Sequence, residues 1–158
     1  MTILVTGAAG FIGSNFVLDW CAQNQETVLN IDKLTYAGNL ENLASLQNNA
    51  QHIFVQADIA NGDLMLELLT KHQPRAIINF AAESHVDRSI SSAMPFAHTN
   101  FLGLTNLLEG FRDFCKGRFI QISTDEVYGS ISQGSWSEDR PLSPNSPYSA
   151  SKAGAADI

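Results

Sequence analysis

The stretch TILVTGAAGFIGSNFVLDW, residues 2–20, decides how the rest of the chain can fold. It begins with a short apolar run typical of a buried strand, places glycine at Gly7, Gly10 and Gly13, and then continues as a helix. Glycine is needed where the backbone takes a positive φ or approaches a ligand closely. The free N–H groups at the start of such a helix favour a bound anion, and a dinucleotide pyrophosphate is the natural candidate.

The spacing of these glycines leaves an alternative open. The first gap holds two residues where the dinucleotide fingerprint has one, so an ordinary glycine-rich turn between strand and helix is possible. The position of the turn, directly after a strand and at the opening of a helix, favours the dinucleotide interpretation. We expect Phe11 and Ile12 to offer backbone N–H groups to the pyrophosphate while their side chains pack in the core.

Composition limits the classes of partner. The chain has 158 residues, enough for one domain, and its net charge of −7 without a Lys/Arg cluster argues against nucleic acid and anionic membranes. Its apolar runs are too short to span a bilayer. Cys21 and Cys115 are isolated and predict reduced thiols in a cytoplasmic protein. His52, His72 and His98 have no carboxylate or cysteine at metal-ligand spacing, and no metal site is predicted.

Segments typical of strands and helices alternate along the chain, which predicts an α/β doubly wound (Rossmann-type) parallel sheet with helices on both faces. The predicted strands cover residues 2–5, 26–31, 52–56, 75–80 and 118–122, and the predicted helices include residues 63–72 and 99–114. In such a fold the ligand site lies at the carboxyl ends of the strands. The residues that follow the five strands, and should share that rim, are Gly7, Asp32, Asp58, Ala81 and Ser123.

Two acidic residues at strand ends bear on the choice of cofactor. Asp32 follows the second strand, where a carboxylate accepts hydrogen bonds from the adenosine ribose hydroxyls and repels a 2′-phosphate. NAD is therefore favoured over NADP, with a solvated strand-end aspartate as the alternative. Asp58, after the third strand, is placed to accept from the adenine amino group, with Ile59 against the ring.

Tyr148 and Lys152 lie four residues apart and share a face of a predicted helix. A lysine ammonium there stabilises a phenolate and lowers the tyrosine pKa from about 10 toward neutrality, so that the tyrosine can act as a base. A solvated surface pair is the alternative for this spacing alone. The helix runs to the end of the sequence without a stop signal, so we expect the chain to be a fragment.

Together the stretches TGAAGFIG (residues 6–13) and YSASK (148–152) resemble the extended short-chain dehydrogenase/reductases. Three further stretches are similar to those of the dTDP-glucose 4,6-dehydratases in particular: DKLTYAGN (32–39), AAESHVD (81–87) and TDEVYG (124–129). Members of that family are about twice as long as this chain, as is usual where a second lobe binds substrate. The resemblance therefore implies an NAD-binding Rossmann domain over residues 1–158, truncated before the substrate-binding lobe.

The resemblance also implies a lyase that converts dTDP-glucose to its 4-keto-6-deoxy product and water with tightly bound, recycled NAD. Tyr148, helped by Lys152, would take the proton from the sugar 4-hydroxyl while hydride moves from carbon 4 to NAD, and Thr124 would hydrogen-bond that oxygen. Glu126 would then remove the hydrogen on carbon 5, Asp125 would protonate the departing 6-hydroxyl, and hydride would return to carbon 6. Two adjacent carboxyls with opposite roles need different pKa values.

The residues expected to contact ligands form two sets. Those expected to contact NAD are Gly7, Gly10, Phe11, Ile12, Gly13, Asp32, Lys33, Leu34, Thr35, Asp58, Ile59, Phe80, Ala81, Ala82, Ser84, Thr99, Tyr148 and Lys152. Those expected to contact the nucleotide sugar are Ser84, His85, Thr124, Asp125 and Glu126. For His85, packing within its loop is an equal alternative.

The resemblance further implies a homodimer, formed by the helix over residues 99–114 and the helix that starts near Tyr148. Phe101, Leu104, Leu108 and Phe111 fall on one apolar face of the first of these.

Two other functions stay open. An epimerase or decarboxylase of nucleotide sugars is the first, although the Asp125-Glu126 pair argues against it. A non-catalytic NAD-binding module is the second, and we expect the fragment alone to be inactive. The substrate diphosphate needs cationic partners, and Arg88 is a candidate.

Overall fold

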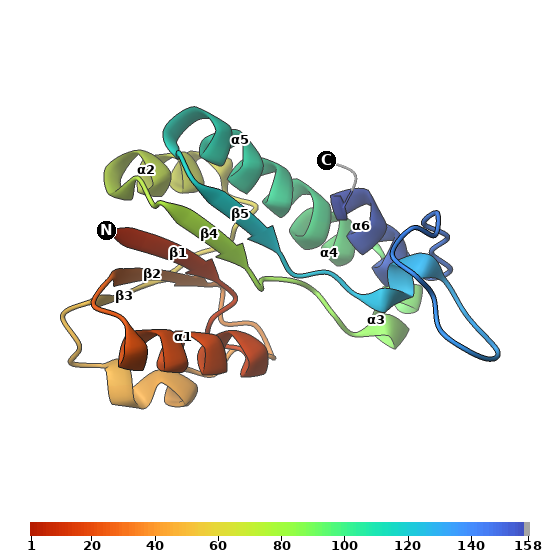
Figure 1. The fold of residues 1–158 in the computed structure, drawn as a ribbon, viewed down its shortest axis with the longest axis horizontal. Helices are drawn as coiled ribbons and strands as arrows, with labels where there is room; N and C mark the ends of the chain where they lie inside the picture. The colour runs from red at the N-terminus through yellow and green to blue at the C-terminus, as the bar shows by residue number, and fades with distance from the viewer. Residues whose placement is uncertain (157–158) are drawn as a thin grey trace.

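The computed structural model describes residues 1–156, arranged around a five-stranded parallel sheet in the order β3-β2-β1-β4-β5 (Figure 1). The strands are β1 (Thr2–Thr6), β2 (Thr27–Asp32), β3 (His52–Gln56), β4 (Ala76–Asn79) and β5 (Arg118–Gln121). Every neighbouring pair is parallel, and the strand order reverses direction at β1. The predicted doubly wound sheet is confirmed, with strand ends that match the predicted ones or differ from them by one residue.

Helices cover both faces of the sheet, as predicted (Figure 1). The α-helices are α1 (Phe11–Gln23), α2 (Gly62–His72), α3 (Val86–Ser91), α4 (Met94–Phe96), α5 (Leu104–Phe114) and α6 (Pro147–Ala156). Short 3₁₀ segments are η1 (Leu40–Leu46) and η3 (Asp125–Tyr128), and η2 (Ala97–Gly103) is π-helical. The final residues of the predicted last helix, Asp157 and Ile158, lie outside the described residues.

Two apolar cores result from the alternation of side chains along the central strands. Ile3 and Val5 of β1 point toward α1 and η1, whereas Leu4 points to the opposite face, toward α2 and α5. All three side chains are fully buried, because both faces of the central strand are covered. Within residues 1–156, no helix has the length and apolar character needed to cross a membrane.

The predicted helix over residues 99–114 is not one regular helix. It begins as η2 and becomes α5 only at Leu104. A π-helical turn holds more residues than an α-helical turn, so side chains before Gly103 are rotated out of line with those after it. Leu104 and Leu107 are buried, Leu108 is only partly buried, and Phe101 is 45% exposed. The single apolar face predicted for this segment is therefore wrong.

Candidate functional site

The carboxyl ends of the strands open onto one cavity of about 410 Å³, a volume typical of ligand sites. All five residues predicted to share this rim line the cavity: Gly7, Asp32, Asp58, Ala81 and Ser123. Of the residues expected to contact NAD, all except Leu34 line it as well. The topology brings them together because parallel strands present their carboxyl ends at the same edge of the sheet.

The glycine turn between β1 and α1 forms the floor of the cavity. Gly7 has φ +67°, and a Cβ there would lie 2.5 Å from the backbone nitrogen of Ala81, so only glycine fits. Gly10 caps α1 without a side-chain hydrogen bond, and the first turn of α1 contains no acidic residue. The positive end of α1 therefore meets no negative group of its own helix, and its first N–H groups suit a bound phosphate.

Phe11 and Ile12 line the cavity but do not pack in the core. Their side chains are 82% and 63% exposed, so the prediction that they are core residues is wrong. Phe11 and Ile12 open α1 at the cavity rim, whereas the next residues, Gly13 and Ser14, are already buried, and Val17 is fully buried.

Asp32, at the end of β2, is buried and holds the surrounding backbone. Its Oδ2 accepts from the backbone N–H of Ala9 at 2.8 Å, and its Oδ1 accepts from that of Leu34 at 2.8 Å. Each carboxylate oxygen keeps a further lone pair that can accept from a ribose hydroxyl. Leu34 does not reach the cavity, because its side chain packs against the core beneath α1.

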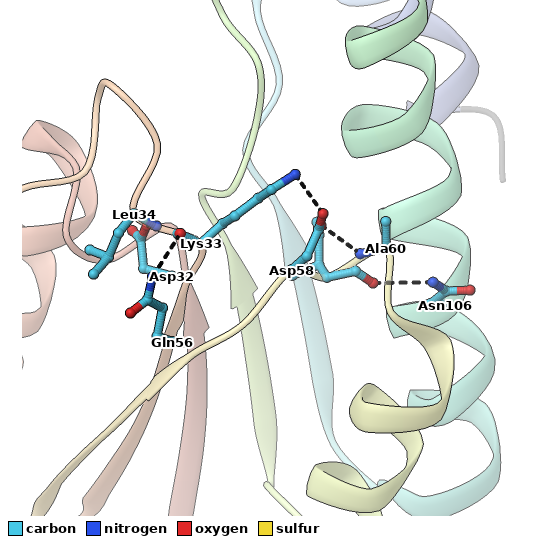
Figure 2. A network of polar contacts seen from close by, with 8 residues as sticks. Asp32, Lys33, Leu34, Gln56, Asp58, Ala60 and Asn106 are labelled. Atoms are coloured by element: carbon cyan, nitrogen blue, oxygen red, sulfur yellow. Dashed lines mark hydrogen bonds and ion pairs between the residues drawn. The ribbon is translucent and has the colours of Figure 1, made fainter.

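Asp58 and Lys33 form an ion pair at the neighbouring strand ends, with Lys33 Nζ 2.6 Å from Asp58 Oδ2 (Figure 2). Burial raises the pKa of Asp58, but Lys33, the Ala60 N–H and the charge of His98 act against burial and hold it below its usual value. Ile59, next in the chain, is 3% exposed and lines the cavity. This wall is therefore apolar at Ile59 and charged at the ion pair.

Tyr148 and Lys152 lie on α6 at the other end of the cavity, and both are buried. Lys152 Nζ donates to the carbonyl oxygen of Ile122 at 2.5 Å, and burial lowers the pKa of Lys152 to about 8. The backbone N–H of Tyr148 donates to Ser89 Oγ at 3.1 Å. The helix spacing thus brings the pair to the cavity, as expected from the sequence.

The pKa of Tyr148 is raised rather than lowered. Burial raises it most, a hydrogen bond with Thr124 lowers it, and the charges of Glu126 and Asp125 raise it further. In this structure the Lys152 ammonium is bound to a backbone carbonyl, and its charge is not among the influences that lower the phenol pKa. The predicted shift toward neutrality is therefore wrong for the chain as it stands.

Thr124 caps η3, and Asp125 and Glu126 begin it; all three lie beside the cavity, outside its lining. Thr124 Oγ1 accepts from the Glu126 N–H at 3.3 Å and donates to Asp125 Oδ1 at 3.4 Å. Asp125 is exposed whereas Glu126 is half-buried, so the adjacent carboxyls have different surroundings. His85 is exposed and also lies outside the lining, and Arg88 sits over the ring of Tyr36 at 4.1 Å.

Asn100 supports the site from outside the cavity lining, and sequence reasoning missed it. It is 2% exposed, and its amide joins two walls of the site: Oδ1 accepts from the Glu83 N–H at 2.8 Å, while Nδ2 donates to Glu83 O and to Ser151 Oγ, each at 2.9 Å. Its position within η2 agrees with the frequent occurrence of π-helical turns at functional sites. A single asparagine in a helical segment carries no pattern that could have identified it.

Comparison with known proteins agrees with this geometry. A family model described as GDP-mannose 4,6 dehydratase matches residues 4–158. A dTDP-glucose 4,6-dehydratase of Xanthomonas campestris pv. campestris (strain B100) is 54% identical over 162 residues, which cover 96% of this chain and 46% of that protein. The chain thus spans about half the length of the curated relatives it matches.

Solved structures show the same partial coverage. DesIV, a dTDP-glucose 4,6-dehydratase from Streptomyces venezuelae solved with NAD bound, is 49% identical with a TM-score of 0.93, covering 98% of this chain and 49% of that one. A UDP-Glc/GlcNAc 4-epimerase from Campylobacter jejuni superposes nearly as well, with a TM-score of 0.91, 27% identity and coverage of 99% and 47%. The chain belongs to the dTDP-glucose 4,6-dehydratase family, within the extended short-chain dehydrogenase/reductases covered by the matching family model.

Proposed function

We propose that the full-length protein is an NAD-dependent dTDP-glucose 4,6-dehydratase and that residues 1–158 form its NAD-binding domain. The observation that carries the proposal is that one cavity joins the uncapped N-terminus of α1 to the buried pair Tyr148 and Lys152. A phosphate-binding helix end and a candidate general base thus belong to a single site. The dTDP-glucose 4,6-dehydratases that are 54% and 49% identical to this chain support the choice of reaction.

The lining residues fit NAD. The free N–H groups at the start of α1 would receive the pyrophosphate, and the buried carboxylate of Asp32 would accept from the adenosine ribose hydroxyls. NAD held by these residues would supply the acceptor for the hydride of carbon 4 and, once reduced, the donor of hydride to carbon 6. Solved relatives hold NAD, among them the Streptomyces venezuelae protein and a Bacillus anthracis dTDP-glucose 4,6-dehydratase.

The side chains at the α6 end would handle the protons. Tyr148 would take the proton of the sugar 4-hydroxyl, with Thr124 donating to the same oxygen. The raised pKa of Tyr148 opposes this role, so a cation must stabilise the phenolate. Lys152, with a pKa of about 8, is still largely protonated at neutral pH and can supply that charge. Glu126 would remove the hydrogen on carbon 5, and Asp125 would protonate the departing hydroxyl.

The fold does not distinguish a dehydratase from an epimerase, because the Campylobacter jejuni epimerase shares it. The distinction rests on the adjacent carboxyls. Epimerisation at carbon 4 needs no acid for a departing 6-hydroxyl, whereas dehydration needs both a base at carbon 5 and that acid. Glu126, half-buried, and Asp125, exposed, provide two carboxyls in different surroundings beside Tyr148.

The test is to compare three variants in the full-length protein by stopped-flow absorbance of NADH. Tyr148→Phe should slow the first oxidation by about 10²–10⁴-fold, so no bound NADH accumulates. Glu126→Gln and Asp125→Asn should oxidise the sugar and then stall, so bound NADH and the 4-keto sugar accumulate. Normal dehydration by Glu126→Gln would overturn the assignment of the base.

The 158-residue chain alone provides a second measurement. Calorimetric titration should show NAD binding, because every lining residue named above lies within the described part of the chain. Turnover of dTDP-glucose should be absent, because relatives of this chain continue for about as many residues again. Conversion of dTDP-glucose by the purified chain would contradict this expectation.

A further inference from the structure

A cation lies directly beside the carboxylate expected to hold the adenosine ribose. Lys33 follows Asp32, and the pairing of Asp32 with Gln56 places the ends of β2 and β3 side by side. The Lys33 side chain extends away from Asp32 across the gap between the two strand ends and meets Asp58, with Nζ 2.6 Å from Oδ2 (Figure 2).

Asp58 is the fixed member of this pair. Its Oδ1 accepts from the Ala60 N–H at 3.0 Å, and its carbonyl accepts from the Asn61 N–H at 2.9 Å. From α5, Asn106 Nδ2 donates to the carbonyl of Ile59 at 3.1 Å and anchors the same turn (Figure 2). The Asp58 side chain is 23% exposed and that of Lys33 is 51% exposed, so the better-anchored carboxylate sets the position of the more exposed ammonium.

The location of this ammonium matters for choosing between two cofactors. In dinucleotide sites, an acidic residue at the end of the second strand selects the ribose 2′-hydroxyl, and a nearby cationic side chain accommodates a 2′-phosphate instead. Two lysines line the cavity in the part of the chain described, Lys33 and Lys152. Lys152 is bound to the carbonyl of Ile122, which leaves Lys33 as the lining cation next to Asp32.

We propose that Asp58 is a specificity-determining residue that holds the Lys33 ammonium away from the ribose 2′ position and thereby denies a phosphate-binding cation to NADP. The site then rejects NADP in two ways: Asp32 repels the 2′-phosphate, and Asp58 withholds the cation that would compensate. This inference rests on the proposed binding of NAD.

The test is a calorimetric titration of the chain with NAD and with NADP. Asp58→Asn removes the charge that holds Lys33 and keeps an amide oxygen that can accept from the Ala60 N–H. We expect the ratio of its NADP affinity to its NAD affinity to rise about tenfold, as one charge-assisted contact to phosphate permits, because a changed adenine contact of residue 58 affects both cofactors alike. In a Lys33→Met background the same Asp58→Asn change should give no gain for NADP.

The Lys33→Met background separates the proposal from simple electrostatics. If removal of any negative charge near the cavity improved NADP binding, Asp58→Asn would help equally with and without Lys33, and the proposal would be overturned. No gain in either background would overturn it as well. If a thermal scan shows that Asp58→Asn does not fold, Asp58→Ser replaces it. The serine hydroxyl can accept from the Ala60 N–H, and the variant is again titrated with and without Lys33→Met.

The chain contains a matched control. Glu26 and Arg75 form an ion pair at 2.5 Å with exposures of 20% and 44%, close to the values for Asp58 and Lys33, but neither residue lines the cavity. Glu26→Gln should leave the ratio of NADP to NAD affinity unchanged. If the unaltered chain did not bind NAD at all, the proposed function would fail, whereas NAD binding without the Lys33-dependent gain would refute only the role of Asp58.

Discussion

The two ends of the cavity are built by different means. At the β1–β2 end, the functional groups are largely backbone N–H groups and a buried carboxylate that itself accepts two backbone N–H groups. At the β5–α6 end, they are titratable side chains on short helical segments, with Asp125 exposed. The strands differ in the same way: β1 is buried along nearly its whole length, whereas β5 is an edge strand with Ile120 46% exposed.

This difference separates binding from chemistry. The cradle of backbone N–H groups formed by the glycine turn, residues 7–13, is fixed by the fold and cannot change its charge. These properties suit the recognition of a cofactor. Side chains such as Lys152 and Tyr148 have pKa values displaced by burial and by neighbouring charges, which suits proton transfer. The cradle should therefore tolerate no change in shape, while the catalytic end should respond mainly to charge and pH. Three predictions test that contrast.

The largest effect is expected from a methyl group in the cradle. Gly7→Ala combines a positive φ with a Cβ placed 2.5 Å from the Ala81 nitrogen, and it should reduce the free energy of unfolding by about 3 kcal/mol and abolish NAD binding. Gly134, in the exposed loop before α6, has φ +86° with no atom within 4 Å of a Cβ. Gly134→Ala should cost only about 1 kcal/mol. Urea unfolding of both variants measures the difference, and equal losses would contradict the shape requirement.

The next effect is a pH dependence at the catalytic end. Burial lowers the pKa of Lys152 from 10.5 to about 8, so between these values the unfolded chain binds more protons than the folded chain. The free energy of unfolding should therefore increase by roughly 2 kcal/mol as the pH rises from about 8 to 10.5. Below pH 8 the folded chain bears the full destabilisation from burying the charged Lys152 ammonium.

Other groups titrate in the same range, so the measurement is the difference between variants. Lys152→Met should lack this gain in denaturant unfolding between pH 7 and 10. Lys116→Met, which changes an exposed lysine, should keep the pH profile of the unaltered chain. If Lys152→Met retained the profile, Lys152 would not be charged and buried in the way described.

The smallest effect concerns the association of two copies of the protein through the helices at the catalytic end of the cavity. We expect a homodimer in the full-length protein through η2, α5 and α6, and Leu102 on η2 is 43% exposed. Leu102→Ser should weaken association roughly fivefold, about 1 kcal/mol, because part of one leucine side chain is no longer buried. Leu104 is unsuitable as a probe, since it is 1% exposed and its loss would damage the core.

Sedimentation of full-length variants measures this association. Leu66→Ser, on α2, changes a leucine that is 46% exposed and provides the matched control. Equal weakening by both variants would show that the effect is not specific to this face. An unaltered dimer in Leu102→Ser would place the contact on another surface.

Features that repeat along the sequence could be predicted. The alternation of strands and helices indicated the doubly wound sheet, and the residues after each strand indicated the rim of the cavity. These predictions succeeded because parallel strands joined by helices have few possible arrangements. The exposure of Phe11 and Ile12 was missed because apolar character predicts burial only where another element covers the residue, and these two side chains face the open cavity rim.

What the sequence by itself determined is the fold, the glycine cradle and the Tyr148–Lys152 spacing, because each appears in the sequence as a short motif or a regular period. Only the tertiary structure decided which side chains act on one another across the cavity. The ion pair of Lys33 with Asp58, the Asn100 amide between Glu83 and Ser151, and the direction of the Tyr148 pKa shift all join residues from different elements. Their interactions depend on distance and burial in the folded chain, and neither quantity is a property of local sequence.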